Sequence, residues 1–498
     1  MILSKSKFIL GQQCHKSLWL NIKGIEPTNK PDESAQDRLS AGNEVGEVAK
    51  GLFPNGADIA YHHGDLKKMC DLTSEAIKSG ETSIYEASFM EDDIFIRVDI
   101  MNKTPQGWDM YEVKSSSSLR SYHKEDANLQ WHVLKKVNGL VLNNAYVITL
   151  NNEYSKDGEI IPDKLFKKHL LTEYVKENLD QVEIDLKDIK AMSLEKEEPK
   201  VSIGAHCKKP HACQYLDKCW PENTKDTDSV FKLYRLNLDK KLAFYNQGID
   251  IFEKIELGTN LSSTQHNQIQ ANKTKEPIID RLVINKFIET IEYPISYFDF
   301  ETFTDAVPLF DGQRPHMQMP FQYSLHIQAN AENVLDSNED HCEFIAKVDE
   351  DPRRAIAESM LKNIPKSGSI MAYNQSFEKN CIKSLAAHCP DISNELLALN
   401  DRFVDLIDPF RGGGYYHHDF QGSFSIKKVL PAICPDNKEL DYKILDINNG
   451  AMASSSYKAM REQDDEDRAL VRKRLFEYCC LDTYAMYEIY SKLLQVIK

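Results

Sequence analysis

A pair of acidic residues at the end of an apolar run is the feature that most constrains the fold. The run Ile295–Phe298 leads directly into Asp299 and Glu301. Side chains of a β-strand alternate between its two faces, so both carboxylates would lie on one face of this strand. Near the C-terminus, Tyr478 and Asp482 are four residues apart in a helical pattern and would also share one face. These patterns predict an α/β unit in which acids from distant segments meet.

Acids gathered in this way favour one kind of chemistry. Hard divalent cations such as Mg²⁺ take oxygen ligands, above all carboxylates. A pair of such ions stabilises both the attacking and the leaving oxygen when a phosphodiester bond is hydrolysed. The pattern therefore predicts a hydrolase that depends on Mg²⁺ or Mn²⁺.

Composition sets the wider limits. A chain of 498 residues that is 41% hydrophobic and 28% charged is typical of a water-soluble protein with two or three domains. No apolar segment reaches membrane-spanning length and the N-terminus has no secretion signal, which predicts a cytoplasmic protein without a membrane partner. The net charge of −16 disfavours nucleic acid as a partner. That objection fails if bound metal neutralises clustered acids while local lysines and arginines hold phosphates.

Changes in composition suggest three parts along the chain. A charge-rich stretch, Lys187–Lys200, precedes a group of cysteines, and the pattern then becomes helical from Pro221 to about Glu289. We expect a first domain over residues 1–222, a helical connector over 223–290 and a second domain over 291–498. The second domain would start with the strand that carries the acidic pair and end with a long helix from about Asp464.

Three motifs in the C-terminal part occur in a recognisable order. After the acidic pair comes a turn and helix start, Asn374-Gln-Ser-Phe-Glu378, and the last motif is Tyr478-Cys-Cys-Leu-Asp482. This order resembles the DnaQ-like (DEDD) 3′→5′ exonucleases, in their tyrosine subgroup, which have an RNase H-like fold. The resemblance implies catalytic roles for Asp299, Glu301, Glu378, Tyr478 and Asp482.

In that resemblance Asp299, Glu301 and Asp482 hold two metal ions, and Tyr478 orients or deprotonates the attacking water. Glu378 departs from the pattern, because the family has aspartate there. The extra methylene group moves the carboxylate in a site where a misplacement of about 1 Å can cost about 10²-fold in rate. The site is then either active or degenerate, and Asp405 is a candidate to compensate.

A second acidic motif lies in the N-terminal part. Asp99 falls in a strand pattern, and after a turn Glu112 and Lys114 fall on one face of its hairpin partner. Two acids bind a divalent ion, while a neighbouring ammonium group stabilises negative charge on phosphate. The motif resembles the core of the PD-(D/E)XK nucleases, which implies a restriction-endonuclease-like mixed sheet. Two helical segments, which contain Glu47 and Gln130, resemble flanking motifs of the RecB-like branch. This resemblance implies that Gln130 is a catalytic residue and that Glu47 is an extra metal ligand.

Four of the eleven cysteines form a separate pattern. Cys207, Cys213 and Cys219 follow one another at six-residue steps, and Cys14 lies far upstream. Four thiolates bind either a [4Fe–4S] cluster or a tetrahedral zinc ion, and the spacing lacks the paired knuckles usual for zinc. One distant cysteine followed by a trio resembles the iron–sulfur staple of RecB-family nucleases. The resemblance implies a structural [4Fe–4S] cluster; zinc and unligated thiols are the alternatives.

Together these motifs predict two nuclease modules in one chain, a pairing that resembles a bacterial family of predicted nucleases. We expect metal-dependent hydrolysis of phosphodiester bonds, by an exonuclease rather than an endonuclease. DNA is favoured over RNA, as single strands or ends. The alternatives are a 3′→5′ exonuclease that acts on RNA, a nucleic-acid-binding protein in which one or both sites are degenerate, and one active module beside a clamp.

Overall fold

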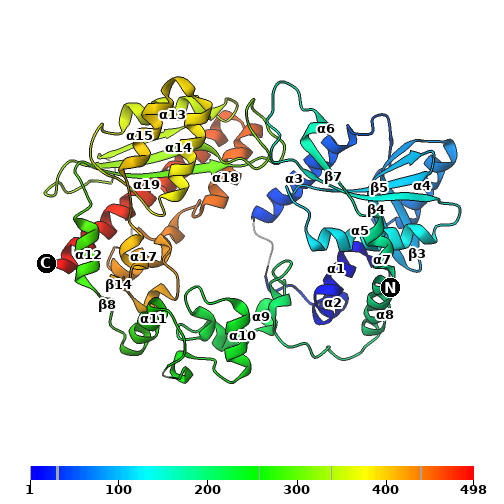
Figure 1. Cartoon of the computed structure of the whole chain (residues 1–498), viewed down its shortest axis with the longest axis horizontal. Coiled ribbons are helices and arrows are strands. Elements are labelled where there is room, and N and C mark those ends of the chain that lie inside the picture. The colour runs from blue at the N-terminus through cyan, green and yellow to red at the C-terminus, as the bar shows by residue number, and fades with distance from the viewer. Residues whose placement is uncertain (1, 30–32, 257, 338, 438–439) are drawn as a thin grey trace. The chain divides into compact units, whose positions relative to one another are not determined.

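The computed structural model describes residues 2–29, 33–256, 258–337, 339–437 and 440–498. The chain forms two compact units, each with mixed sheets and helices, so the predicted α/β class is confirmed (Figure 1). The first unit is Met1–Trp220 with Asp305–Met317, and the second is Pro221–Thr304 with Gln318–Lys498. Residues 223–290, predicted as a connector, thus belong to the second unit. Among the described residues, none of the helices combines the length and apolar character needed to cross a membrane.

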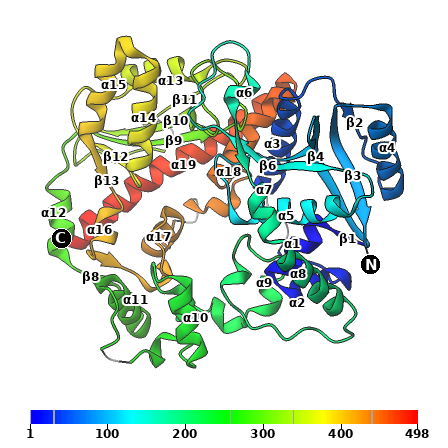
Figure 2. The same cartoon turned by 45° about the vertical axis from the view of Figure 1, so that its right-hand side comes forward.

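A seven-stranded sheet organises the first unit (Figure 2). Its path is β2-β3-β4-β5-β6-β7, and β1 pairs in parallel with the start of β4. The strands β3, β4 and β5 are antiparallel neighbours, whereas β5 and β6 are parallel and joined through helix α5. The strands are β1 (Leu3–Ser4), β2 (Ala57–Asp58), β3 (Ser83–Glu91), β4 (Ile94–Thr104), β5 (Gly107–Lys114), β6 (Leu142–Leu150) and β7 (Phe166–Leu170).

The sheet of the first unit splits between β4 and β5. These strands pair only from Ile100 to Thr104 of β4, and further back β1 pairs with Ile94 and Phe95 instead. The gap opens where the predicted acids of the two strands lie. The helices of this unit are α1 (Lys5–Gln13), α2 (His15–Ile22), α3 (Glu33–Lys50), α4 (Leu66–Ser79), α5 (Ser121–Lys136), α6 (Pro162–Leu165), α7 (Thr172–Glu177), α8 (Leu179–Ser193) and α9 (Leu216–Cys219).

A five-stranded sheet in the order β11-β10-β9-β12-β13 organises the second unit. The strands β9, β10 and β11 are antiparallel neighbours, whereas β9, β12 and β13 run parallel. The strands are β9 (Ile295–Phe303), β10 (Met319–Gln328), β11 (His341–Ile345), β12 (Ile370–Ala372) and β13 (Phe403–Asp405). A separate antiparallel pair joins β8 (Ile278–Ile279) to β14 (Tyr415–Tyr416).

The two faces of the β9 sheet have different cover. Phe298 and Phe300 point into an apolar core with Ile356 of α13 and Leu385 of α14. The long helix α19 packs on β9 and β10 from the opposite side (Figures 1 and 2). Alternation along β9 therefore sends its acids toward α19. The helices of this unit are α10 (Leu238–Asn246), α11 (Ser263–Thr274), α12 (Arg281–Ile288), α13 (Pro352–Asn363), α14 (Ser376–His388), α15 (Ser393–Leu399), α16 (Asp408–Arg411), α17 (Ile426–Ile433), α18 (Gly450–Ala459) and α19 (Asp465–Ile497).

Candidate active sites and metal centre

The acids predicted from the C-terminal motifs meet in the second unit. Asp299 and Glu301 come from β9 and Asp482 from α19, and one carboxylate oxygen of each lies within 4.8 Å of the others. Tyr478 lies one turn before Asp482 on the same helix, and both line a cavity of about 350 Å³ together with the two β9 acids. The expected convergence of these four side chains is confirmed.

Burial and mutual repulsion make this cluster electrostatically unfavourable as an anion. Burial, and then the charges of Asp482, Glu378 and Glu301, raise the pKa of Asp299 well above its ordinary value. Burial, and then the charges of Asp482 and Glu378, raise the pKa of Glu301 to about 8. Burial raises the pKa of Asp482 to about 6 even though it accepts a hydrogen bond. Acids that cannot all ionise alone are relieved either by protons or by a divalent cation.

Glu378 belongs to the same site but is not part of the closest trio. It lies in the first turn of α14 and is buried, with an exposed fraction of 2%. Its Oε2 atom is buried without a hydrogen-bond partner. Burial raises the pKa of Glu378 to about 8, and its charge raises the pKa values of Asp299 and Glu301. A buried oxygen without a partner next to other acids is what a cation ligand looks like in the absence of the cation.

Asp405, at the end of β13, accepts hydrogen bonds from the neighbouring backbone. Its carboxylate accepts the backbone N–H groups of Asn374 at 2.8 Å, Gln375 at 3.1 Å and Ile407 at 3.3 Å. Asn374 has a φ of +78°, a left-handed conformation that needs such local support. Asp405 therefore holds the turn that starts α14 and so positions Glu378. Asp405 is not among the residues that line the acid cavity, and the suggestion that it compensates as a ligand stays a prediction.

Two further residues complete this site, and the motifs did not reveal them. Tyr442 donates a hydrogen bond to Asp482 Oδ1 at 2.6 Å. Lys427 Nζ, from α17, lies 3.5 Å from Tyr478 Oη. Burial, followed by the charges of the neighbouring acids, raises the pKa of Tyr478 far above its ordinary value. Tyr478 therefore keeps its proton at neutral pH.

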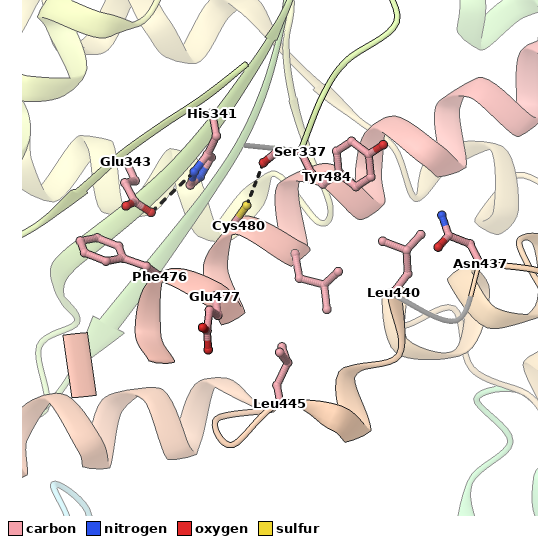
Figure 3. Close-up of a pocket in the computed structure, with 11 residues that line it drawn as sticks. Ser337, His341, Glu343, Asn437, Leu440, Leu445, Phe476, Glu477, Cys480 and Tyr484 are labelled. Atoms are coloured by element: carbon pink, nitrogen blue, oxygen red, sulfur yellow. Dashed lines mark hydrogen bonds and ion pairs between the residues drawn. The ribbon is translucent and has the colours of Figure 1, made fainter. Parts of the chain in front are cut away.

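Two other features of the second unit resemble sites more weakly. His417, His418 and Asp419 also bring ligand atoms within 4.8 Å of one another, but they are neighbours in sequence and would be close in almost any fold. A cavity of about 440 Å³ lies along a different face of α19, lined by Phe476, Cys480 and residues of β11 (Figure 3). Its polar contacts pair protein groups with one another, as where the Cys480 thiol donates to Ser337 O at 3.3 Å.

The acids of the first unit lie where β4 and β5 diverge. Asp99 Oδ2 accepts the backbone N–H of Val113 at 2.6 Å, where a bond between the two strands would otherwise form. Glu112 is the residue before Val113 and is buried. Burial, and then the charge of Glu112, raise the pKa of Asp99 to about 7. The predicted pair of acids therefore shares one site.

Lysines neutralise Glu112 within the protein. Lys5 Nζ and Lys114 Nζ each lie 2.7 Å from Glu112 Oε1, and Gln130 donates to its Oε2 at 2.6 Å. Burial opposes the charge of Glu112, but the two lysines outweigh burial and lower its pKa. Lys114 also pairs with Asp126, one turn before Gln130 on α5. Lys5 and Asp126 had no sequence signal.

Glu47 does not join this group. It is exposed on α3 and forms an ion pair with Lys50 at 2.6 Å, and Lys50 also contacts Asp58. Glu47 is not among the groups that shift the pKa values of Asp99 and Glu112 most strongly. Its proposed role as an extra ligand has no support in the structure, because the contacts of this helix face are surface ion pairs.

Glu86 is the acid that approaches Asp99 instead. The paired residues on either side place Glu86 of β3 opposite Asp99 of β4. Its φ of +56° is rare for a residue with a side chain and interrupts the regular strand. The charge of Glu86 contributes to raising the pKa of Asp99. Strain of this kind often accompanies functional sites. Only the strand register could have revealed this residue.

The four selected cysteines surround one cavity of the first unit. Cys14 caps the end of α1, and Cys207, Cys213 and Cys219 come from the segment that follows α8. Burial, and to a smaller extent the charges of Cys213 and Cys207, raise the pKa of the Cys14 thiol. The structure describes all four cysteines, and no three of their sulfur atoms lie within 4.8 Å of one another. Four thiolates around zinc, at 2.3 Å each, would lie about 3.8 Å apart.

Comparisons with known proteins find a domain and relatives without a described function. Residues 296–425 match a domain of unknown function, DUF2779, and this region contains Asp299, Glu301 and Glu378 but not α19. The chain is 27% identical over 289 residues to an uncharacterized MG366 homolog of Mycoplasma pneumoniae, which covers 53% of this chain and 42% of that protein. It is 26% identical over 219 residues to uncharacterized protein MG366 of Mycoplasma genitalium, which covers 41% and 32%. The matches thus span less than half the length of these relatives.

Proposed function

We propose that this chain is a metal-dependent nuclease whose second unit hydrolyses phosphodiester bonds. The observation that carries the proposal is the convergence of Asp299, Glu301 and Asp482 from a strand and a helix far apart in sequence. The orphaned oxygen of Glu378 supports it, since the donor set is entirely carboxylate oxygen and suits Mg²⁺ or Mn²⁺. When bound, such ions stabilise charge on the attacking and leaving oxygens.

The side chains of the second unit have distinct roles in this proposal. The three converging acids and Glu378 would hold the ions. Tyr442 fixes the orientation of Asp482 through its short hydrogen bond. Tyr478, one helical turn before Asp482 in the same cavity, would orient or deprotonate the attacking water. The resemblance to DEDD exonucleases favours a free 3′ end as the substrate. The resemblance of the first unit to PD-(D/E)XK nucleases favours DNA over RNA. We also propose a cytoplasmic location.

The first unit is a second candidate nuclease site, of the PD-(D/E)XK kind. Asp99, Glu112, Lys114 and Gln130 meet at the split between strands, which supports this assignment. Both oxygens of Glu112, however, are engaged by protein groups. A metal ion would have to displace them. This observation favours a division of labour in which the second unit cuts and the first unit acts as a clamp on nucleic acid.

The cysteine cavity is proposed to hold a [4Fe–4S] cluster. The donors are all thiols, and no three of these described thiols lie within 4.8 Å of one another, as the ligands of one tetrahedral ion would. Cys14 would tie α1 to the segment that contains the other three ligands. Anaerobically prepared protein should then be brown and contain iron, whereas colourless protein with zinc would contradict the assignment.

Cleavage assays with single variants test the proposed function. Purified protein is incubated with end-labelled single- and double-stranded DNA and RNA in Mn²⁺. We expect shortening of single-stranded DNA from its 3′ end, lost in Asp299→Asn and retained in Asp99→Asn. Loss in both variants would show that both sites are needed. Tight binding without cleavage under any of these conditions would support a binding protein with degenerate sites.

A further inference from the structure

Lys427 is the one positively charged residue among those that line the acid cavity of the second unit, all of which the structure describes. The same lining contains four carboxylates: Asp299, Glu301, Glu378 and Asp482. Lys427 forms no ion pair with any of them, although its charge lowers the pKa values of Asp299 and Glu301. The ammonium group of Lys427 is therefore close enough to affect the acids but is not paired with any of them.

Aromatic rings hold this ammonium group in place. Lys427 Nζ lies 4.9 Å from the centre of the Tyr442 ring and 5.1 Å from that of Tyr478. It donates hydrogen bonds to Asn448 O and to Tyr478 Oη. An ammonium group has three N–H donors, so one remains for another acceptor. Its position is fixed by contacts with residues that line or neighbour the cavity, which is what pre-organised binding of a small anion requires.

The sum of the charges in the cavity indicates which group would accept the third N–H of Lys427. Four carboxylates and two divalent ions cancel, which leaves the charge of Lys427 unbalanced. One phosphodiester group carries a single negative charge and restores neutrality. We propose that Lys427 is the subsite for the non-bridging oxygens of the substrate phosphodiester, next to the ions and not a ligand of them. This assignment rests on the proposed function and adds the group that recognises the anion.

The neighbouring Lys428 provides a matched control. It is exposed on the same helix and contacts Gln421 rather than the cavity. The test compares Lys427→Met, Lys427→Arg and Lys428→Met in two binding measurements, after their thermal unfolding has been matched. Calorimetry measures Mn²⁺ affinity, and fluorescence anisotropy measures binding of a labelled oligothymidylate in Ca²⁺.

We expect Lys427→Met to weaken oligothymidylate binding by about tenfold or more, as expected for loss of a charged hydrogen bond. Its Mn²⁺ affinity should rise, because a repelling cation has been removed. Lys427→Arg should retain most of the binding, and Lys428→Met should match the original protein in both measurements. Unchanged oligothymidylate binding in Lys427→Met, or a parallel loss of Mn²⁺ binding, would overturn the subsite.

The two proposals fail in distinguishable ways. If the protein binds oligothymidylate through Lys427 but cleaves no substrate, the subsite is supported and the proposed nuclease activity is contradicted. Protein that cleaves, with a cleavage rate and an oligothymidylate affinity insensitive to Lys427→Met, keeps the nuclease and removes the subsite.

Discussion

The two acid sites of this chain balance their charges in opposite ways. In the first unit, Glu112 is enclosed by Lys5 and Lys114, and its pKa is lowered. In the second unit, burial and neighbouring acids raise the pKa of Glu301 to about 8, and the nearest lysine forms no ion pair with it. The first site is neutralised by the protein itself. The second is left for protons or divalent ions to neutralise.

This difference follows from where the lysines are attached. Lys114 is two residues from Glu112 on one strand, and Lys5 begins α1, directly after the strand β1 that pairs with β4. Lys427 instead donates to Asn448 O and Tyr478 Oη and lies against aromatic rings. A buried acid that is paired stays ionised without metal, whereas unpaired buried acids gain most from a cation. The comparison predicts that metal binding and catalysis concentrate in the second unit.

The largest expected effect is that of Asp299→Asn on cleavage. Removing a central ligand should lower the cleavage rate on the order of 10³-fold, because transition-state charge loses its preorganised partner. The same variant should lose the rise in unfolding temperature that Mn²⁺ gives the original protein. Asp401→Asn, an exposed acid of the same unit, is the control and should behave like the original. A Mn²⁺ stabilisation that persists in Asp299→Asn but disappears in Asp99→Asn would reverse the comparison.

The second effect concerns the cysteines of the first unit. Cys14→Ser should abolish bound iron and lower the stability of that unit by more than about 3 kcal/mol, since metal binding adds to the free energy of folding. Cys70→Ser is the matched control, because Cys70 is half-buried in the same unit and does not line the cysteine cavity. Iron content and calorimetric unfolding measure both changes. Full iron occupancy in Cys14→Ser would remove this cysteine from the ligand set.

Local periodicity explains what could be predicted from the sequence. The alternation of a strand placed Asp299 and Glu301 on one face, and the turn of a helix did the same for Tyr478 and Asp482. The strands that contain Asp99 and Glu112 were predicted for the same reason and are confirmed by β4 and β5. In each case the relation depends on neighbours in sequence, which a single chain displays directly.

Residues placed by tertiary contacts could not be predicted. Lys5, Lys427 and Tyr442 reach their sites from segments with no fixed spacing to the acids. The choice between Glu47 and Glu86 depended on strand register, because only the pairing of β3 with β4 places Glu86 opposite Asp99. Position along the chain carries no information about such contacts.

The third effect is on pH dependence without metal. The pKa values of Glu301 and Glu378 are raised to about 8, from about 4.3 in an unfolded chain. Between these values the folded state binds more protons, so stability falls as pH rises from about 4 to about 8. In the first unit the raised pKa of Asp99 acts in the same direction up to about pH 7, and the lowered pKa of Glu112 opposes it only below about pH 5. Unfolding temperatures in EDTA should therefore fall with pH for both units, and the fall should extend to about pH 8 only for the second unit.

Glu301→Gln and saturating Mg²⁺ each sharpen that measurement. Either change should flatten the decline, the variant by removing a titrating acid and the ion by replacing protons. If the metal-free protein instead gains stability between pH 5 and pH 8, the acids of the second unit are paired in solution and the comparison fails.

The smallest effect is expected for Lys5→Met. Glu112 would keep Lys114 and Gln130, so the loss of one partly exposed partner should cost about 1–2 kcal/mol. The change should also make the first unit more like the second, because Glu112 Oε1 would gain capacity for a cation. The test uses calorimetry of the Lys5→Met/Asp299→Asn double variant, in which the second unit has lost a metal ligand. We expect this variant to bind Mn²⁺ weakly, and we expect the added substitution Asp99→Asn to abolish that binding. If Lys5→Met leaves Mn²⁺ binding unchanged there, Lys114 alone is sufficient to neutralise the site, and the first unit is a clamp that does not need metal.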